Sequence, residues 1–423
     1  MSASFFKETV SYYGRHNFVL NHYIREIEKL SRLRPADALA LKRQKAMELI
    51  RNAAKTPFYR QLYAGIDLNR NFTEVYDSLP QLTKTDLRAN ALNMLTRPQS
   101  LLKKAHTSGT SGSPLTVYRS VRSIIREYAH VWFFRREHGL YLGDRIVSMR
   151  GVLDATTFRY FNKAENTLYL SSYLLSSKTI HQYAEQLLHF RPKAIFSFPN
   201  TLFALANFLK DAGLQVEVPL IFTSSETLYP FQRERIEKEL NGRIFDWYGN
   251  AERTIALGQC EMGYYHEAPL YGISEFDEKG AVTTSLINRA FPLIRYFVDD
   301  HFTVMPDDCP CGRGRGVISI DGRSEDFVRL PNGTQVVGLG LAFREIPHLR
   351  FAQIFQDEIS SLRINVVTGA DFNVADEELL RHKLNLLLNN SINITFNKVE
   401  ENEIVKSPSG KYRLVMSTVS SCS

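Results

Sequence analysis

The stretch that decides the fold runs from residue 194 to residue 248 and reads AIFSFPNTLFALANFLKDAGLQVEVPLIFTSSETLYPFQRERIEKELNGRIFDWY. It contains three short apolar segments with the composition of buried strands and, between them, two segments with helical periodicity that each end near a glycine. In chain order these segments are 194–198, 201–211, 220–223, 231–240 and 243–248. Strand, helix, strand, helix and strand in about fifty residues predict a parallel, doubly wound α/β sheet.

Polar residues follow each of the three predicted strands. They occupy positions 199–200, 224–226 and 248–252. Ligands of open α/β sheets gather beyond the carboxyl ends of the strands. The sequence therefore predicts a ligand site at this edge of the sheet before any family is considered.

The segments on either side of this core differ from it in composition. Residues 1–100 are mostly helical in pattern and basic, whereas the part after Gly322 predicts a separate α+β unit with strands at 362–367 and 392–397. We therefore expect an α/β protein with doubly wound mixed or parallel sheets and a helical N-terminal part, followed by a small mobile C-terminal domain. The expected boundaries are 1–321 and 322–423.

Composition narrows the class of protein. The 423 residues are 44% hydrophobic and 23% charged, which is typical of globular proteins. No apolar run has the length of a membrane span and no secretory leader is expected, so we predict a cytoplasmic protein without integral membrane association. The net charge of +7 indicates an ordinary basic surface or a small anionic substrate rather than nucleic acid.

The stretch TSGTSGSP at 107–114 is rich in hydrogen-bond donors. Its two glycines allow the backbone to approach a ligand closely, and its five hydroxyl side chains and backbone N–H groups suit phosphate oxygens. A Walker A loop is excluded because no Gly-Lys-Ser/Thr follows. On composition alone, a plain Ser/Gly turn remains the alternative.

Five motifs occur in a fixed order along the chain. They are TSGTSGSP at 107–114, YGNAE at 248–252, IRYFVDD at 294–300, DGRSED at 321–326 and SGK at 409–411. This series resembles the adenylate-forming superfamily of acyl-CoA synthetases and adenylation domains, in particular its phenylacetate–CoA ligase branch with the capsule-polysaccharide-biosynthesis relatives. The resemblance covers about residues 45–415.

The resemblance implies an AMP-forming ligase. A carboxylate attacks the α-phosphate of ATP, pyrophosphate leaves, and the acyl-adenylate then passes its acyl group to an acceptor. Because two anions meet and charge builds on the α-phosphate, such a site must neutralise, align and exclude water. The cofactors implied are ATP and Mg²⁺, with coenzyme A as one possible acceptor.

The motifs also imply roles for individual residues. Lys411 matches the mobile catalytic lysine, and Glu252 matches the Mg²⁺ ligand. The nucleotide would be bound by Thr107, Ser108, Gly109, Thr110, Ser111, Gly112, Ser225, Glu226, Asp246, Tyr248, Gly249, Asp300 and Arg323. Each has an ordinary alternative: a tail lysine, a solvated glutamate, a core tyrosine or an exposed ion pair.

The motifs do not decide two features of the site, the ribose ligand and the acyl pocket. Asp300 aligns with the aspartate that binds the ribose, but Asp299 stands beside it and the register could differ by one. The acyl pocket is also undecided, because aromatic side chains at strand and helix spacing are more often part of an ordinary core. The candidates for this pocket are Phe196, Phe198, Phe203 and Phe222.

Four side chains form a candidate metal site. Cys260 and His266 lie six residues apart, and Cys309 and Cys311 share one tight turn. Three thiolates and one imidazole suit a structural Zn²⁺ in tetrahedral coordination. The spacing is looser than in a zinc ribbon, so free thiols remain the alternative.

The acceptor is not fixed by these motifs. The segment 328–337 departs from phenylacetate–CoA ligases, so coenzyme A, an amino-sugar, an amino acid or a carrier thiol all remain possible. We therefore predict ATP-dependent activation of a small carboxylic acid with transfer to a thiol or amine. The alternatives are the same chemistry acting on a sugar in surface-polysaccharide biosynthesis, and a catalytically silent nucleotide- or partner-binding homologue.

Overall fold

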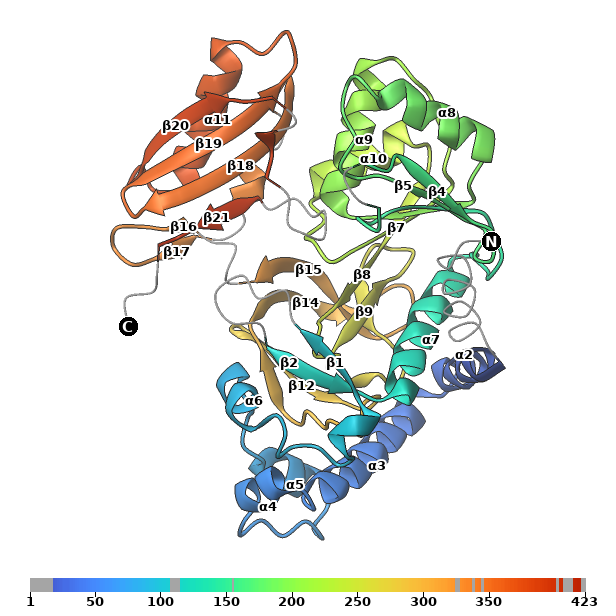
Figure 1. Ribbon diagram of the computed structural model, residues 1–423. Coiled ribbons are helices and arrows are strands. Elements are labelled where there is room, and N and C mark those ends of the chain that lie inside the picture. Colours follow the sequence, from blue (N-terminus) through green and yellow to red (C-terminus); the bar gives the residue numbers. More distant parts are fainter. Residues whose placement is uncertain are drawn as a thin grey trace. The chain divides into compact units, whose positions relative to one another are not determined.

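The computed structural model describes residues 18–106, 115–153, 156–323, 328–336, 339–343, 346–400, 403–405 and 414–419. The chain divides into two compact units (Figure 1). Unit 1 comprises Met1–Tyr141 and Trp247–Ile320, and unit 2 comprises Leu142–Asp246 and Asp321–Ser423. The division at residues 321 and 322 into a large and a mobile small domain stays a prediction.

Unit 1 opens with helices, as the sequence predicted. Side chains cap several of them: Thr56 and Asn71 accept hydrogen bonds from backbone N–H groups of the first turns, and Thr83 forms a capping box with Asp86. The helices are α2 (Phe18–Ser31), α3 (Pro35–Ala53), α4 (Pro57–Leu62), α5 (Phe72–Ser78), α6 (Lys84–Asn90) and α7 (Val121–Glu137).

The strands of unit 1 form three groups. A hairpin pairs β1 (Lys103–His106) with β2 (Thr116–Arg119), and a second group has the order β11 (Gly272–Asp277), β12 (Gly280–Ser285) and β13 (Tyr296–Val298). The third group has the order β14 (Asp300–Asp308), β15 (Arg315–Arg323), β10 (Tyr265–Glu267), β9 (Ala256–Gln259) and β8 (Arg243–Gly249). A shared apolar core, which includes the buried Tyr59, Tyr76 and Phe291, joins helices and strands.

Unit 2 contains the sheet predicted from residues 194–248. Its strand order is β8, β7 (Leu220–Ser224), β6 (Ala194–Ser197), β3 (Ile146–Met149), β5 (Thr167–Leu170) and β4 (Arg159–Asn162). Strands β7, β6, β3 and β5 pair in parallel, and β4 pairs antiparallel with β5. Helices α8 (Ile180–Phe190), α9 (Pro199–Asp211) and α10 (Pro230–Glu239) pack on the aliphatic face of these strands.

The C-terminal part of unit 2 is a four-stranded sheet with one helix. The strand order is β20 (Asn393–Lys398), β19 (Ser361–Thr368), β18 (Leu349–Glu358) and β21 (Val415–Ser417). Helix α11 (Val374–Leu387) starts at a capping box of Asn373 and Asp376 and adds its leucines to the core of this sheet. Short elements precede it: β16 (Val328–Arg329), β17 (Gln335–Val336) and the 3-10 helix η2 (Leu339–Phe343).

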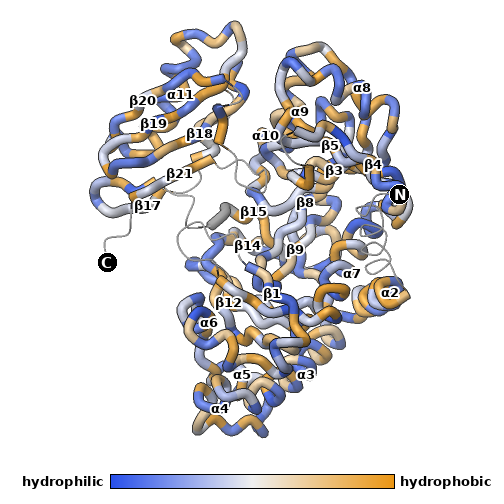
Figure 2. The backbone as a smooth tube through the Cα atoms, viewed as in Figure 1, coloured by the Kyte–Doolittle hydropathy of each residue, from blue (hydrophilic) through white to orange (hydrophobic). Residues whose placement is uncertain are grey.

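The predicted fold class is confirmed: a mixed α/β protein with helices at its start and a separate C-terminal sheet. Helices and strands contain both hydrophobic and hydrophilic segments (Figure 2). Within the described residues, no helix combines the length and apolar composition needed to cross a membrane.

Candidate functional site

The carboxyl edge of the parallel strands in unit 2 carries a connected set of polar groups. Glu226 accepts a hydrogen bond from the backbone N–H of Asn200 at 3.2 Å, and the Asn200 side chain accepts one from Gln232 at 2.7 Å. Ser225 has a φ of 72°, in the left-handed region that non-glycine residues rarely adopt. Backbone strain of this kind is common where a chain positions functional groups.

Asp246 lies on β8 of the same unit. Its carboxylate is 4% exposed and accepts a hydrogen bond from the hydroxyl of Thr223 on β7. Buried carboxylates are costly unless they are hydrogen-bonded, and this contact meets that need. The structure therefore places three of the predicted nucleotide-binding residues on neighbouring strands: Ser225 and Glu226 just after β7, and Asp246 within β8.

Arg150 is a residue at this edge that sequence reasoning missed. It directly follows β3, and its Nη2 donates to Ser224 Oγ at 2.7 Å. Burial lowers the pKa of Arg150, while Asp246 and Glu226 act in the opposite direction. The available signal was the apolar run 146–149 ending in a basic residue, but that run was not recognised as a strand of the sheet.

In unit 1, Tyr248 and Asp300 meet although 52 positions separate them. The Tyr248 hydroxyl donates to Asp300, which is 7% exposed, and the Tyr248 ring packs edge-on against Phe302 at 5.4 Å. The neighbouring Asp299 has a different partner, since Lys84 Nζ lies 2.9 Å from its Oδ1. The two aspartates that sequence reasoning could not distinguish therefore have different surroundings.

Glu252 is also held by a tyrosine. The hydroxyl of Tyr296 donates to Glu252 Oε1 at 2.9 Å, and Glu252 is 7% exposed. The turn beside it is fixed by Arg119, which donates to the carbonyl of Ala251, and it continues into Arg253 with a φ of 59°. Tyr296 belongs to the IRYFVDD motif at 294–300, but its contact with Glu252 was not predicted.

Other predicted residues cannot be placed in this way. Thr107, Ser108, Gly109, Thr110, Ser111 and Gly112, together with Lys411, lie outside the described residues. Arg323 ends β15, and Gly249 ends β8 in an exposed position. The structure thus brings together Tyr248 with Asp300, while the predicted phosphate-binding loop and the lysine stay predictions.

The four predicted metal ligands form one cluster in unit 1. The ligand atoms of Cys260, His266, Cys309 and Cys311 all lie within 4.8 Å of one another. The Sγ atoms of Cys260 and Cys309 are 3.9 Å apart, and Cys311 Sγ is 3.3 Å from His266 Nε2. Zn–S bonds of ~2.3 Å and Zn–N bonds of ~2.05 Å at tetrahedral angles predict about 3.8 Å and about 3.5 Å for these separations. The donor set therefore fits a tetrahedral zinc ion.

Local backbone geometry builds this cluster. The carbonyl of Cys260 accepts from Gly263 N, and the carbonyl of Cys309 accepts from Gly312 N, so both cysteines sit on tight turns. Gly316 lies against the imidazole, because a Cβ added there would be 3.0 Å from His266 Cε1. A glycine at this position therefore leaves the room that the histidine ring occupies.

The protonation states of two ligands follow from burial. Burial lowers the pKa of His266 to about 4, helped by Arg313, so the imidazole is neutral and able to bind a metal at neutral pH. Burial raises the pKa of the Cys311 thiol to about 12, while the backbone N–H of Arg313 lowers it. A divalent cation is the group that stabilises a thiolate in such surroundings.

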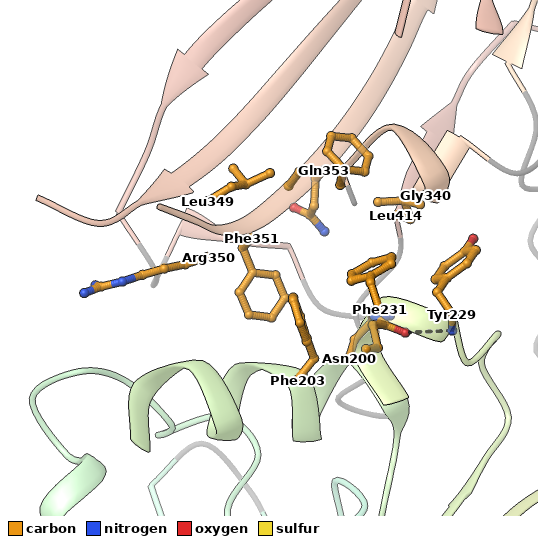
Figure 3. A pocket seen from close by; sticks show the side chains of 13 residues that line it. Asn200, Phe203, Tyr229, Phe231, Gly340, Leu349, Arg350, Phe351, Gln353 and Leu414 are labelled. Carbon is orange, nitrogen blue, oxygen red and sulfur yellow. Dashed lines mark hydrogen bonds between the residues drawn. The ribbon is translucent and has the colours of Figure 1, made fainter. Parts of the chain in front are cut away.

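A small aromatic pocket lies elsewhere in unit 2 (Figure 3). Phe203 of α9 and Phe231 of α10 pack edge to face at 5.4 Å on one side, and Phe351 of β18 lies close to Phe203 on the other. Phe203 therefore contributes to this pocket. In contrast, Phe196 and Phe222 face each other across β6 and β7 at 5.7 Å.

Comparison with solved structures defines the class of fold. The chain resembles 2-hydroxyisobutyryl-CoA ligase in the postadenylation state in complex with R3-HIB-AMP, with a TM-score of 0.69 and 17% identity over 91% of this chain and 90% of that one. It also resembles the anthranilate CoA ligase AuaEII in complex with anthranoyl-AMP, with a TM-score of 0.51 and 13% identity over 76% and 68%. The fold is therefore that of adenylate-forming CoA ligases.

Sequence comparison points to a particular relative. The chain is 25% identical to Protein CapK of Staphylococcus aureus over 424 residues, which cover 94% of this chain and 93% of that protein. Residues 331–418 match the CapK C-terminal domain. The resemblance predicted from the five motifs is thus confirmed, both to the CoA ligases and to their capsule-related relatives.

Proposed function

We propose that this protein activates a carboxylic acid with ATP through an acyl-adenylate and then transfers the acyl group to an acceptor. The observation that carries the proposal is the pair of buried carboxylates, Glu252 and Asp300, each held by a tyrosine hydroxyl in a chain with the fold of adenylate-forming CoA ligases. Buried carboxylates held in this way suit a hard cation and a diol, the two partners that a magnesium nucleotide presents.

The proposed roles follow from these surroundings. Asp300, buried beside Tyr248, accepts the ribose hydroxyls, whereas Asp299 is engaged by Lys84. Glu252 would hold Mg²⁺, which supplies positive charge next to the phosphates. Tyr296 keeps the Glu252 carboxylate oriented, and orientation of a ligand by a second group raises the precision of such sites.

The remaining roles rest on the motifs. Residues 107–112 hold the β- and γ-phosphates, Ser225, Glu226 and Asp246 surround the adenine, and Arg323 contacts ribose or phosphate. Lys411 binds the attacking carboxylate and the α-phosphate together, because one ammonium can offset the repulsion between two anions. Closing of the C-terminal part over the site would exclude water.

Coenzyme A is the proposed acceptor, because the solved structures with this fold include 2-hydroxyisobutyryl-CoA ligase. Similarity to Protein CapK supports a second candidate, in which the adenylate acylates an amine or hydroxyl of a sugar in surface-polysaccharide biosynthesis. Discharge of the enzyme-bound adenylate by coenzyme A or by amino-sugars, measured as loss of acyl-AMP, separates the two.

Pyrophosphate exchange over a panel of aryl, fatty, amino and uronic acids tests the proposal. At least one acid should support exchange of labelled pyrophosphate into ATP, and Lys411→Ala should abolish that exchange while ATP still binds. Lys210→Ala, which changes a helix-surface lysine of α9, is the matched control and should keep full exchange. ATP binding without exchange for any acid would refute the ligase and favour a silent nucleotide-binding homologue.

We also propose that Cys260, His266, Cys309 and Cys311 hold a structural Zn²⁺. The support is the agreement of two ligand separations with tetrahedral geometry and the neutral imidazole of His266. Four protein ligands leave no open coordination position, so this ion would stabilise the fold and take no part in the reaction. It would fasten the turn at Cys260 to the turn at Cys309.

A further inference from the structure

The face of the unit 2 sheet opposite the aliphatic core has an unusual composition. Strand register places Ser148, Phe196 and Phe222 side by side on β3, β6 and β7. Because side chains on one face recur every second residue, Arg150, Phe198 and Ser224 form the next row toward the carboxyl edge. A row of buried aromatic side chains therefore ends in a guanidinium and a hydroxyl.

Contacts within the row confirm this placement. The Arg150 guanidinium lies 5.5 Å from the centre of the Phe198 ring, and its Nη2 donates to Ser224 Oγ at 2.7 Å. Gly151, directly after Arg150, has a φ of 65°, so the chain turns away at once. Arg150 is thus held by a ring on one side and a hydroxyl on the other.

The charge of Arg150 is not matched by a contacting carboxylate. Among the described residues, no Asp or Glu oxygen lies within ion-pair distance of its nitrogens, whereas Arg350 of the same unit meets Asp211 at 2.7 Å. Asp246 and Glu226 attract it from farther away, and they accept hydrogen bonds from Thr223 and Asn200. A guanidinium has five N–H donors, and within the described part of the chain the hydrogen bonds of Arg150 come from Nη2 alone, to the hydroxyls of Ser224 and Ser225.

Such a group has a defined preference for ligands. A partly desolvated guanidinium favours a planar carboxylate, which it binds through two parallel charge-assisted hydrogen bonds. Adenine is uncharged and gains nothing comparable from it.

We propose that Arg150 selects an acyl substrate that carries a second carboxylate in addition to the one that is activated. This inference rests on the proposed function, since it names the substrate class for the same site. Arg150 is a specificity residue in this scheme. A diacid of suitable length would be preferred over the monoacid of the same chain length, because the monoacid leaves a partly desolvated guanidinium without a contacting carboxylate.

Matched pairs of acids test the proposal by pyrophosphate exchange: dicarboxylic acids against monocarboxylic acids of equal length, in aliphatic and aromatic series. The native protein should use the best diacid about 10- to 100-fold more efficiently, in kcat/KM, than its monoacid. Arg150→Gln should reduce this ratio to about 1, because the diacid loses its partner and the monoacid no longer leaves a guanidinium unpaired. Arg150→Lys should keep an intermediate preference, since it keeps the charge but loses the planar fork.

Three results would overturn the inference. These are exchange by the native protein without a diacid preference, a reduction of diacid and monoacid rates by one common factor in Arg150→Gln, and a rise in the KM for ATP alone in that variant. In the last two cases Arg150 acts on the reacting groups or the nucleotide. Complete absence of exchange in the native protein would instead remove the proposed function itself. Arg159→Gln, on β4 of the same unit, is the matched control and should leave the ratio unchanged.

Discussion

Replacement of one cysteine in the Cys260, His266, Cys309 and Cys311 cluster gives a sharp test of the zinc proposal. Cys309 is 3% exposed, and its sulfur is 3.9 Å from that of Cys260. Cys309→Ser exchanges a thiolate for a hydroxyl, which is a poor zinc ligand. We expect the bound zinc to fall from about one ion per chain to well below that, because three ligands remain.

The expected loss of stability follows from linkage. An ion that binds only the folded protein stabilises it by RT ln(1 + [Zn]/Kd), which is ~4 kcal/mol when free zinc exceeds Kd a thousandfold. For a unit of roughly 200 residues, ~4 kcal/mol corresponds to a fall in Tm of about 10 °C. The same fall should appear when the native protein is treated with a strong chelator.

Zinc content by elemental mass spectrometry and Tm by differential scanning calorimetry, with and without chelator, provide the assay. Cys422→Ser makes the same chemical change at the fourth cysteine, outside the described residues, and should keep both zinc and Tm. The reasoning is refuted if native protein purified without added zinc contains no zinc and its Tm does not change when the chelator is added. Three free thiols would then explain the cluster.

Three further predictions concern the carboxylates and a buried histidine. Tyr296→Phe removes the donor to Glu252 and should lower kcat/KM for pyrophosphate exchange about 10- to 100-fold, since hydrogen bonds to charged groups are worth ~1.5–3 kcal/mol. The control is Tyr59→Phe, which removes a buried hydroxyl that donates to the carbonyl of Pro292. This variant should lower the free energy of unfolding without this effect on the exchange rate. Asp300→Asn should raise the KM for ATP at least tenfold while Asp299→Asn leaves it nearly unchanged, and equal effects of the two would contradict the assignment of the ribose. Burial, with Arg126, lowers the pKa of His130 to about 3, below the ~6.5 of the unfolded chain. The unfolded state therefore takes up the proton first as pH falls, and the native free energy of unfolding should drop by about 2 kcal/mol between pH 6.5 and pH 5 through this residue. In denaturant titrations, the free energy of unfolding of His130→Phe should fall by about 2 kcal/mol less than that of the native protein over this pH range. If the free energy of unfolding of both proteins depends on pH in the same way, the prediction is wrong.

Local patterns were sufficient to predict the elements of the sheet in residues 194–248. Buried strands such as 194–197 are continuous apolar runs, and α9 starts at Pro199, so both ends of each element are encoded nearby. Strand β3 was missed although Gly143-Asp144 and Gly151 flank it, because Ile146–Met149 is only four residues long and Ser148 interrupts its apolar run. Without β3, the position of Arg150 at the carboxyl edge could not be foreseen.

The metal site was predicted from residue types, but not its geometry. Cys260 and Cys309 are 49 residues apart, and only the pairing of β10 with β9 and β15 brings His266 close to both turns. Spacing in sequence therefore could not decide between zinc and free thiols. The distances between the ligand atoms identify which substitutions should remove the ion, so an experiment can distinguish bound zinc from free thiols.

The two adjacent aspartates illustrate what a one-residue difference in register changes. Consecutive residues of an extended chain project to opposite sides, so Asp299 and Asp300 cannot serve the same ligand. Lys84, at the start of α6, binds Asp299, whereas the Tyr248 hydroxyl at the end of β8 reaches Asp300. A motif matched by sequence allows either residue. Lys84 and Tyr248, which are distant in sequence, determine which aspartate is available to the ribose. This assignment therefore depends on the fold and cannot be read from the motif alone.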